Sequence, residues 1–133
     1  MGVGIEETYG MTAAALVSIV DDDESVREAL PDLLRAFGFA VQSFACAEDF
    51  LASGYVRETR CLVLDLVMPG MSGPDLQREL TRMGEPLPIV FITANEDSIE
   101  CTRVVDAGAV CCLIKPFSET ALLSAVMRAI QAR

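Results

Sequence analysis

The chain has 133 residues, of which 52% are hydrophobic and 23% charged, and its net charge is -10. This length fits one globular domain, and the composition excludes a disordered chain. The negative charge disfavours direct nucleic-acid binding, since it repels the phosphate backbone. No apolar run approaches the roughly 18 residues of a membrane helix, and the first 15 residues lack the basic start of a signal peptide. We therefore expect a cytoplasmic protein that binds neither membranes nor nucleic acid.

Short apolar runs alternate five times with amphipathic segments. The apolar runs are predicted to be strands at Leu16–Val20, Phe39–Phe44, Cys61–Asp65, Pro88–Thr93 and Val110–Ile114. The amphipathic segments are predicted to be helices at Glu24–Phe37, Ala47–Ser53, Pro74–Met83, Ser98–Ala107 and Glu119–Gln131. This alternation is typical of a doubly wound α/β fold, with a parallel sheet covered by helices on both faces. Residues 1–14 lack any period and are predicted to be a mobile tail, and residues 15–133 one domain.

Asp65 stands at the end of an apolar strand, directly before a segment that contains Pro69 and Gly70. An ionised carboxylate at the end of a buried strand costs several kcal/mol in lost hydration unless a cation or hydrogen-bond donor meets it. We therefore expect other parts of the chain to supply such partners.

Polar residues also follow the other strands. The first strand ends at Asp21 and Asp22, the fourth at Thr93 and the fifth at Lys115. Because parallel strands open their carboxyl ends onto one edge of the sheet, these side chains and Asp65 should share a crevice. Clustered carboxylates without histidine or cysteine suit a hard cation such as Mg²⁺. A carboxylate, a hydroxyl and an ammonium beside such an ion predict phosphoryl transfer to Asp65.

Four short motifs lie at the ends of the predicted strands. The motifs are D-D after the first strand, D-x-x-M-P-G-M-S-G after the third, T-A after the fourth and K-P-F after the fifth. In this order they resemble the receiver domain of two-component response regulators, most like the FixJ-type branch, from Leu16 to Arg133. The resemblance implies a flavodoxin-like (βα)5 fold with strand order 2-1-3-4-5.

The resemblance also implies a set of metal ligands. Asp65 would be the phosphoacceptor and a ligand of Mg²⁺, and Asp22 would bind the ion directly. Asp21 would act through a water molecule, and the backbone carbonyl of Val67 would complete the protein ligands.

The remaining roles concern the phosphoryl group. Lys115 would pair with it, before a cis Lys115–Pro116 bond, and Thr93 would move toward it and transmit the switch. The donor would be a histidine kinase, and the response would appear on the fourth helix, fifth strand and fifth helix, a surface that also offers a homodimer contact. The chain would catalyse only its own phosphorylation and dephosphorylation, so it is not expected to be a conventional enzyme.

Three positions are of interest against the family pattern. Cys112 stands three residues before the lysine, where relatives usually carry Phe or Tyr, so either the switch is weakened or the fourth helix repacks. Val67 and Asn95 stand where side chains tune water access, and an apolar Val67 predicts a long-lived phosphoryl group. The cysteines lack C-x-x-C spacing and are expected to be reduced core thiols, with a Cys111–Cys112 disulfide disfavoured by strain. They are Cys46, Cys61, Cys101, Cys111 and Cys112.

Other interpretations remain open at this stage. The acidic triplet at 21–23 could cap the first helix, as we expect for Asp23. Lys115 could be a solvated lysine and Thr93 an ordinary strand residue. As a whole, the chain could instead be a small phosphatase of the haloacid dehalogenase type, although Val67 breaks the D-x-D pattern of that family, or a degenerate receiver that only binds protein. The sequence leaves open the kinase, the stimulus, the oligomeric state and whether a DNA-binding output domain belongs after Arg133.

Overall fold

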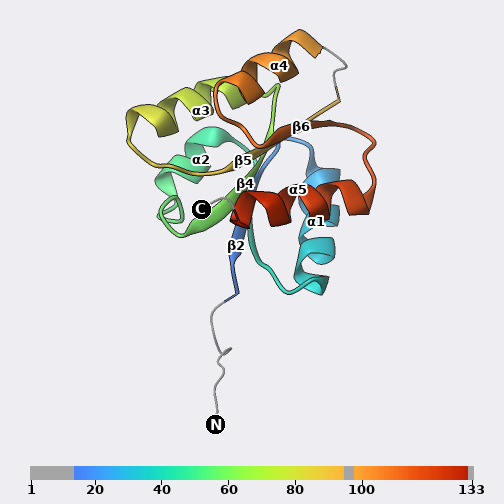
Figure 1. Ribbon diagram of the computed structural model, residues 1–133. Coiled ribbons are helices and arrows are strands. Elements are labelled where there is room, and N and C mark those ends of the chain that lie inside the picture. The colour runs from blue at the N-terminus through green and yellow to red at the C-terminus, as the bar shows by residue number, and fades with distance from the viewer. Residues whose placement is uncertain (1–13, 95–97, 132–133) are drawn as a thin grey trace.

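The computed structural model describes residues 14–94 and 98–131. Its strands and helices alternate along the chain (Figure 1), and the strands are numbered β2 to β6. The strands are β2 (Leu16–Val20), β3 (Ala40–Phe44), β4 (Thr59–Asp65), β5 (Ile89–Thr93) and β6 (Cys111–Ile114). The helices are α1 (Glu24–Ala36), α2 (Ala47–Ala52), α3 (Gly73–Arg82), α4 (Ser98–Asp106) and α5 (Glu119–Gln131). Within these ranges, no helix combines the length and the apolar character needed to cross a membrane.

The strands form a five-stranded sheet in the order β3-β2-β4-β5-β6, and every neighbouring pair is parallel. This is the predicted order 2-1-3-4-5, and the doubly wound fold class is confirmed. The chain order turns back beside β2, so the carboxyl ends of β2 and β4 lie next to each other. The fold thereby provides the crevice that the sequence predicted.

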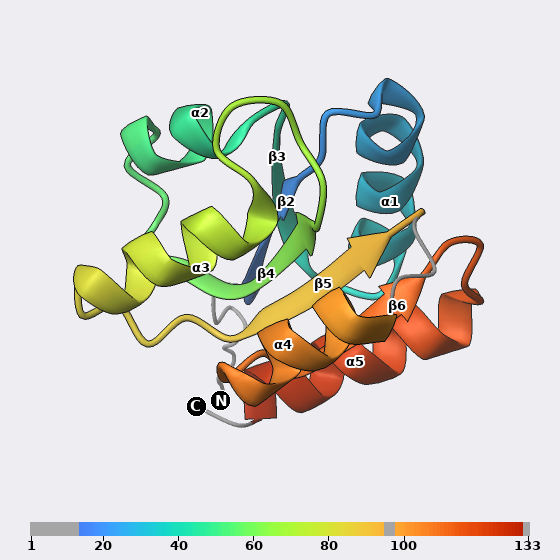
Figure 2. The same cartoon turned by 90° about the horizontal axis from the view of Figure 1, so that it is seen from above.

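Alternate residues of the sheet face two separate cores. Cys61 and Val63 of β4 join the core under α1 and α5, whereas Leu62 and Leu64 join the core under α2, α3 and α4. The view in Figure 2 shows these helix groups on the two sides of the sheet. β4 is therefore buried on both faces, which explains why its sequence is an almost continuous apolar run.

The helix boundaries follow local capping chemistry. Asp23 caps α1, and its carboxylate accepts a hydrogen bond of 2.9 Å from the Ser25 backbone N–H, as predicted. Ser72 and Asp75 form a reciprocal capping box at the start of α3. β4 begins at Thr59, two residues before the predicted start. The buried Thr59 hydroxyl lies 2.7 Å from the Ser18 hydroxyl, so its hydrogen bond is satisfied within the core.

The prediction of reduced core thiols is wrong for two of the cysteines. Cys101 of α4 and Cys112 of β6 are joined in a disulfide, with their Cα atoms 5.5 Å apart. Cys46, Cys61 and Cys111 are free thiols, and Cys111 faces the other core, as strand alternation requires. The pair was missed because its members become neighbours only when α4 packs on β6, which no local spacing reveals.

Candidate functional site

The carboxyl ends of β2, β4, β5 and β6 bring the predicted polar residues to one edge of the sheet. A hollow of about 400 Å³ at this edge is lined by Asp65, Val67, Thr93, Ala94 and Lys115. Next to it, ligand oxygens of Asp21, Asp22 and Asp65 all lie within 4.8 Å of one another. The residues that the sequence placed together are therefore together in the structure, while their chemical roles stay predictions.

Asp21 is fully buried, and both of its carboxylate oxygens have partners. Oδ1 accepts a hydrogen bond of 2.8 Å from the Asp23 backbone N–H, and Oδ2 lies 3.0 Å from Lys115 Nζ. The Arg27 guanidinium donates to the Asp21 carbonyl at 2.9 Å. Lys115 thus neutralises the deepest carboxylate of the cluster, a pairing that the strand-end pattern did not specify. The Arg27 contact could not be predicted from the sequence, which shows only that Arg27 lies one turn into α1.

Asp65 is buried at the end of β4, with 6% of its surface exposed. Burial, and then the nearby Asp21 carboxylate, raise the pKa of Asp65 to about 7, while Lys115 and the Val67 N–H work in the opposite direction. The Val67 N–H donates to Asp65 Oδ1 at 3.3 Å. The cluster therefore carries more negative charge than its one ammonium balances, so it favours an added cation.

The geometry of the acidic cluster fits a small divalent ion. Octahedral Mg²⁺ holds oxygen ligands at about 2.1 Å, so ligands on opposite sides of it lie roughly 4.2 Å apart. The ligand atoms of Asp21, Asp22 and Asp65 all lie within 4.8 Å of one another, so the three carboxylates can surround one ion, directly or through water. Asp22 is exposed, which leaves one side of the cluster open to water. A donor set made only of oxygens suits Mg²⁺ better than a transition metal.

Thr93 and Lys115 are held on adjacent strands. Thr93 is buried at the end of β5 and pairs in register with Ile114 of β6. The Lys115 backbone N–H donates to the Thr93 carbonyl at 2.7 Å, and the peptide bond from Lys115 to Pro116 is cis, as predicted. The sheet thus positions both donors on the wall of the hollow that Asp65 also lines.

The loop from β4 to α3 is packed too closely to admit a side chain at Gly73. A Cβ atom at this position would lie 2.3 Å from the Asp65 carbonyl oxygen and 2.9 Å from Phe91 Cε1. Upstream, Glu48 of α2 accepts a hydrogen bond of 3.2 Å from the Met71 N–H. The sequence analysis missed Glu48, because nothing near it in the chain links it to this loop. Both contacts fix the backbone that follows Asp65.

Of the two residues predicted to affect water access, the structure describes Val67 but not Asn95. Val67 is 61% exposed at the rim of the hollow, so its isopropyl group is available to cover a group bound on Asp65. Asn95, and residues 1–13 of the predicted tail, lie outside the described residues. The division into a tail and a domain at residue 15 stays a prediction.

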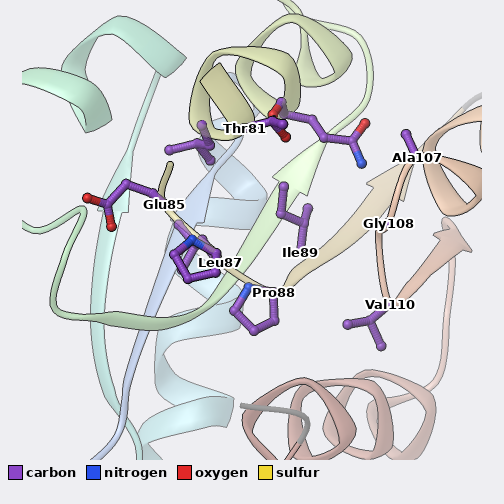
Figure 3. A pocket seen from close by; sticks show the side chains of 11 residues that line it. Thr81, Glu85, Leu87, Pro88, Ile89, Ala107, Gly108 and Val110 are labelled. Carbon is purple, nitrogen blue, oxygen red and sulfur yellow. The ribbon is translucent and has the colours of Figure 1, made fainter. Parts of the chain in front are cut away.

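A second hollow of about 600 Å³ lies at the amino edge of the sheet, between the ends of α3 and α4 (Figure 3). Among the residues that line it, Glu85 is the one titratable group, and its carboxylate lies 3.4 Å from Arg57 Nε. The Gln77 side chain, also in its wall, donates to the Val104 carbonyl at 3.0 Å. These side chains are engaged with the protein itself, so this hollow does not compete with the acidic edge as a reaction site.

Comparisons with known proteins agree with the geometry. The response regulator receiver domain family matches residues 17–127. The response regulator protein TodT of Pseudomonas putida is 42% identical over 118 residues, which make up 89% of this chain and 52% of TodT. Nodulation protein W of Bradyrhizobium diazoefficiens is 43% identical over 117 residues, 88% of this chain and 52% of that protein. The chain spans about half the length of these curated relatives.

Solved structures give the same result. The response regulator StyR superposes with a TM-score of 0.84 at 49% identity, covering 90% of this chain and 61% of StyR. The FixJ-N structure superposes with a TM-score of 0.82 at 38% identity, covering 92% of this chain and 98% of FixJ-N. With its strand order, its acidic edge and these relatives, the chain belongs to the response regulator receiver domains of two-component systems.

Proposed function

We propose that this receiver accepts a phosphoryl group from the phosphohistidine of a histidine kinase onto Asp65, with Mg²⁺ bound beside it. The observation that carries the proposal is the environment of Asp65. It is a buried carboxylate at a strand end that shares its hollow with Thr93 and Lys115 and lies within 4.8 Å of two further carboxylates. Receiver domains are not classical enzymes, and here the only reaction proposed is modification of the chain itself.

In the proposed reaction an Asp65 carboxylate oxygen attacks phosphorus, the new O–P bond forms, and the N–P bond of the phosphohistidine breaks. The electron pair of that bond stays on the imidazole nitrogen of the kinase. Lys115 and Thr93, which line the same hollow as Asp65, would donate to the equatorial phosphoryl oxygens through an ammonium and a hydroxyl. Lys115 would exchange its contact with Asp21 Oδ2 for one with the phosphoryl group.

The metal would be held by Asp22, Asp65 and the Val67 carbonyl, with Asp21 acting through water. Mg²⁺ supplies positive charge that favours the ionised form of Asp65 and neutralises the phosphoryl oxygens. The full engagement of both Asp21 oxygens supports an indirect role for that residue, because neither oxygen is available without loss of a hydrogen bond. The exposure of Asp22 supports the direct role.

The proposed output surface comprises α4, β6 and α5. Large apolar side chains are exposed on each of these elements, and they are Ile99, Val105, Ile114 and Met127. Exposed apolar groups on adjoining elements are typical of a surface that a partner covers. We propose that phosphorylation at Asp65 changes this surface, which then contacts a second copy of the chain or an output partner in the cytoplasm. The chain itself is not proposed to bind nucleic acid.

Val67 supports a slow reverse reaction. Its side chain is apolar and lies at the rim of the hollow, so it cannot hold a water molecule by hydrogen bonding for attack on the acyl phosphate. We expect the phosphorylated protein to survive for much longer than seconds after free phosphodonor is removed. A half-life of seconds in the purified protein would contradict this expectation.

Acetyl phosphate labelling tests the function. The full chain is incubated with acetyl phosphate and Mg²⁺, and the phosphorylated fraction is measured by phosphate-affinity electrophoresis and intact mass. We expect one phosphoryl group on the wild type, none on Asp65→Asn, and none after chelation of Mg²⁺. Asp32→Asn is the matched control, because Asp32 is an exposed carboxylate in the middle of α1, and it should label normally.

The same experiment separates the alternatives. Absence of label on the wild type, together with no Mg²⁺ binding, would identify a degenerate receiver that acts as a binding module. Steady release of phosphate from an aryl phosphate would instead indicate a phosphatase of the haloacid dehalogenase type. No described feature favours that family, since the acidic pair of the cluster follows β2 and the proposed nucleophile ends β4.

A further inference from the structure

We propose that Cys101 and Cys112 form a reversible disulfide, a redox modification site that fixes α4 to β6 when oxidised and releases it when reduced. Cys101 lies in the first half of α4, and Cys112 lies on β6, eleven residues further along the chain. Their Cα separation of 5.5 Å is within the usual range for a bridged pair. The bond can therefore form and break without a change of backbone fold.

Among the described cysteines, this pair is the one suited to exchange. Cys61 is fully buried, and burial raises the pKa of its thiol to about 12, so its reactive thiolate is scarce. Burial also raises the pKa of Cys111, which faces the opposite core from Cys112. Cys46 lies at the start of α2, away from α4 and β6. Cys111 also contributes to the wall of the hollow beside the bridge, but it packs against the core under α1 and α5, whereas Cys112 packs against the core under α2, α3 and α4.

A small reagent can reach the bridge. A hollow of about 310 Å³ lies between α4 and β6, and both cysteines form part of its wall. Both residues are half-buried rather than enclosed in the core. Structural disulfides of secreted proteins resist reduction, whereas accessible pairs in a reducing compartment are transient and responsive. In the cytoplasm proposed for this chain, the bridge present in the structure would open under reducing conditions and close again on exposure to an oxidant.

The oxidant is a low-molecular-weight disulfide. The thiolate of one cysteine attacks a sulfur of the reagent, a mixed disulfide forms, and one thiolate leaves. The second cysteine then attacks the protein sulfur of the mixed disulfide, the bridge forms, and a second thiolate leaves. Two protein thiols lose two electrons and two protons in total, and the reagent is reduced to two thiols. A dithiol reverses both steps.

The position of the bridge gives it a consequence for signalling, which rests on the proposed function. Cys112 pairs in register with Phe91 of β5, two residues before the pair formed by Thr93 and Ile114. In the sequence it stands three residues before Lys115. Further along α4, Val104 is buried in the core, and its carbonyl accepts a hydrogen bond from Gln77 of α3. A covalent link to β6 therefore limits the movement of α4 that the proposed output requires.

The chemistry is tested on the full chain by differential alkylation and peptide mass spectrometry. After treatment with oxidised glutathione, we expect a Cys101–Cys112 linked peptide that dithiothreitol removes. Cys101→Ser should abolish the linked peptide, and Cys111→Ser, on the same strand but facing the other core, should retain it. Finding only mixed disulfides with glutathione, or a link through Cys111, would overturn the proposal.

The restraint on α4 is tested by amide hydrogen exchange without phosphodonor or metal. We expect exchange in residues 104–106 to be about tenfold slower in the oxidised protein than in the reduced one, and equal in both states for Cys101→Ser. Equal rates in oxidised and reduced wild type would overturn the restraint. Acetyl phosphate labelling of the same samples is read separately, so failure to label would count against the proposed function alone.

Discussion

Replacement of Asp65 by Asn should stabilise the metal-free protein. Asp65 is almost fully buried and belongs to a cluster in which Asp21 and Asp22 place ligand oxygens within 4.8 Å. The variant keeps the size of the side chain and removes its charge. Since Lys115 is already engaged with Asp21, the charge on Asp65 is only partly balanced. Removing that charge should therefore relieve repulsion within the cluster.

The magnitude is bounded in two ways, by the raised pKa of Asp65 and by the repulsion from Asp21 that contributes to it. The rise in the pKa of Asp65 from its ordinary 3.8 to about 7 sets an upper limit of about 4 kcal/mol, at about 1.4 kcal/mol for each pH unit. Two like charges about 5 Å apart repel by roughly 3 kcal/mol at an effective dielectric constant of about 20. The open hollow admits solvent, and Lys115 offsets part of the repulsion, so we expect a gain of about 2 kcal/mol.

The pH dependence has a definite sign. Because the folded-state pKa is raised, Asp65 keeps its proton in the folded chain after the unfolded chain has released it. Rising pH therefore favours the unfolded wild type between about pH 4 and pH 7, and the effect is constant above that range. Asn does not titrate, so the stability difference between variant and wild type should grow across this window.

Urea unfolding in EDTA at pH 5.5, 6.5 and 8 measures this difference. We expect Asp65→Asn to exceed the wild type by about 2 kcal/mol at pH 8 and by clearly less at pH 5.5. Saturating Mg²⁺ should reduce or reverse this difference in the free energy of unfolding, because the ion binds the wild-type cluster more tightly than the cluster of Asp65→Asn. An equal gain from Asp32→Asn, an exposed carboxylate on α1, or no gain at pH 8, would refute this account of the cluster.

Three further predictions concern packing, capping and the switch. Gly73→Ala should lower the free energy of unfolding in urea by about 3 kcal/mol, because its Cβ would meet the backbone of Asp65. Gly84→Ala, which has open space around it, should cost about 1 kcal/mol. Equal costs for the two variants would contradict the packing argument. Ser72→Ala should cost about 1 kcal/mol through loss of the capping box, and an unchanged urea midpoint would contradict it. Cys112→Phe should dimerise more tightly than the reduced wild type when loaded with beryllofluoride, as measured by analytical ultracentrifugation, and equal dimerisation would show that the thiol does not weaken the switch.

Most of the fold could be predicted because its elements are encoded locally. The apolar run that ends at Asp65 and the positive-φ Gly38 after α1 mark a strand and a helix end without reference to the rest of the chain. Parallel topology then places the strand ends together, so the composition of the acidic edge was also accessible. The predicted strand began at Cys61 and so left out Thr59, whose partner Ser18 lies on β2 and is distant in the sequence.

The contacts that escaped prediction are those between distant elements. The bridge from Cys101 to Cys112 depends on how α4 lies on β6, and the contact from Glu48 to Met71 on how α2 lies beside the β4–α3 loop. The sequence also indicated a cation near the carboxylates, but it did not show that the Lys115 ammonium would pair with Asp21 and not with Asp65. That choice depends on depth of burial, which periodicity does not measure.

The close packing at Gly73 changes what the motif around it can reveal. The absence of room for a Cβ atom is a steric demand of the turn, and it would persist in a descendant whose phosphoryl chemistry had been lost. A glycine at this position therefore indicates that the turn is intact, and it does not indicate whether Asp65 can be phosphorylated. Positions that can change without harm to the turn, such as the exposed Asp22, are the ones whose identity distinguishes a working receiver from an inherited scaffold.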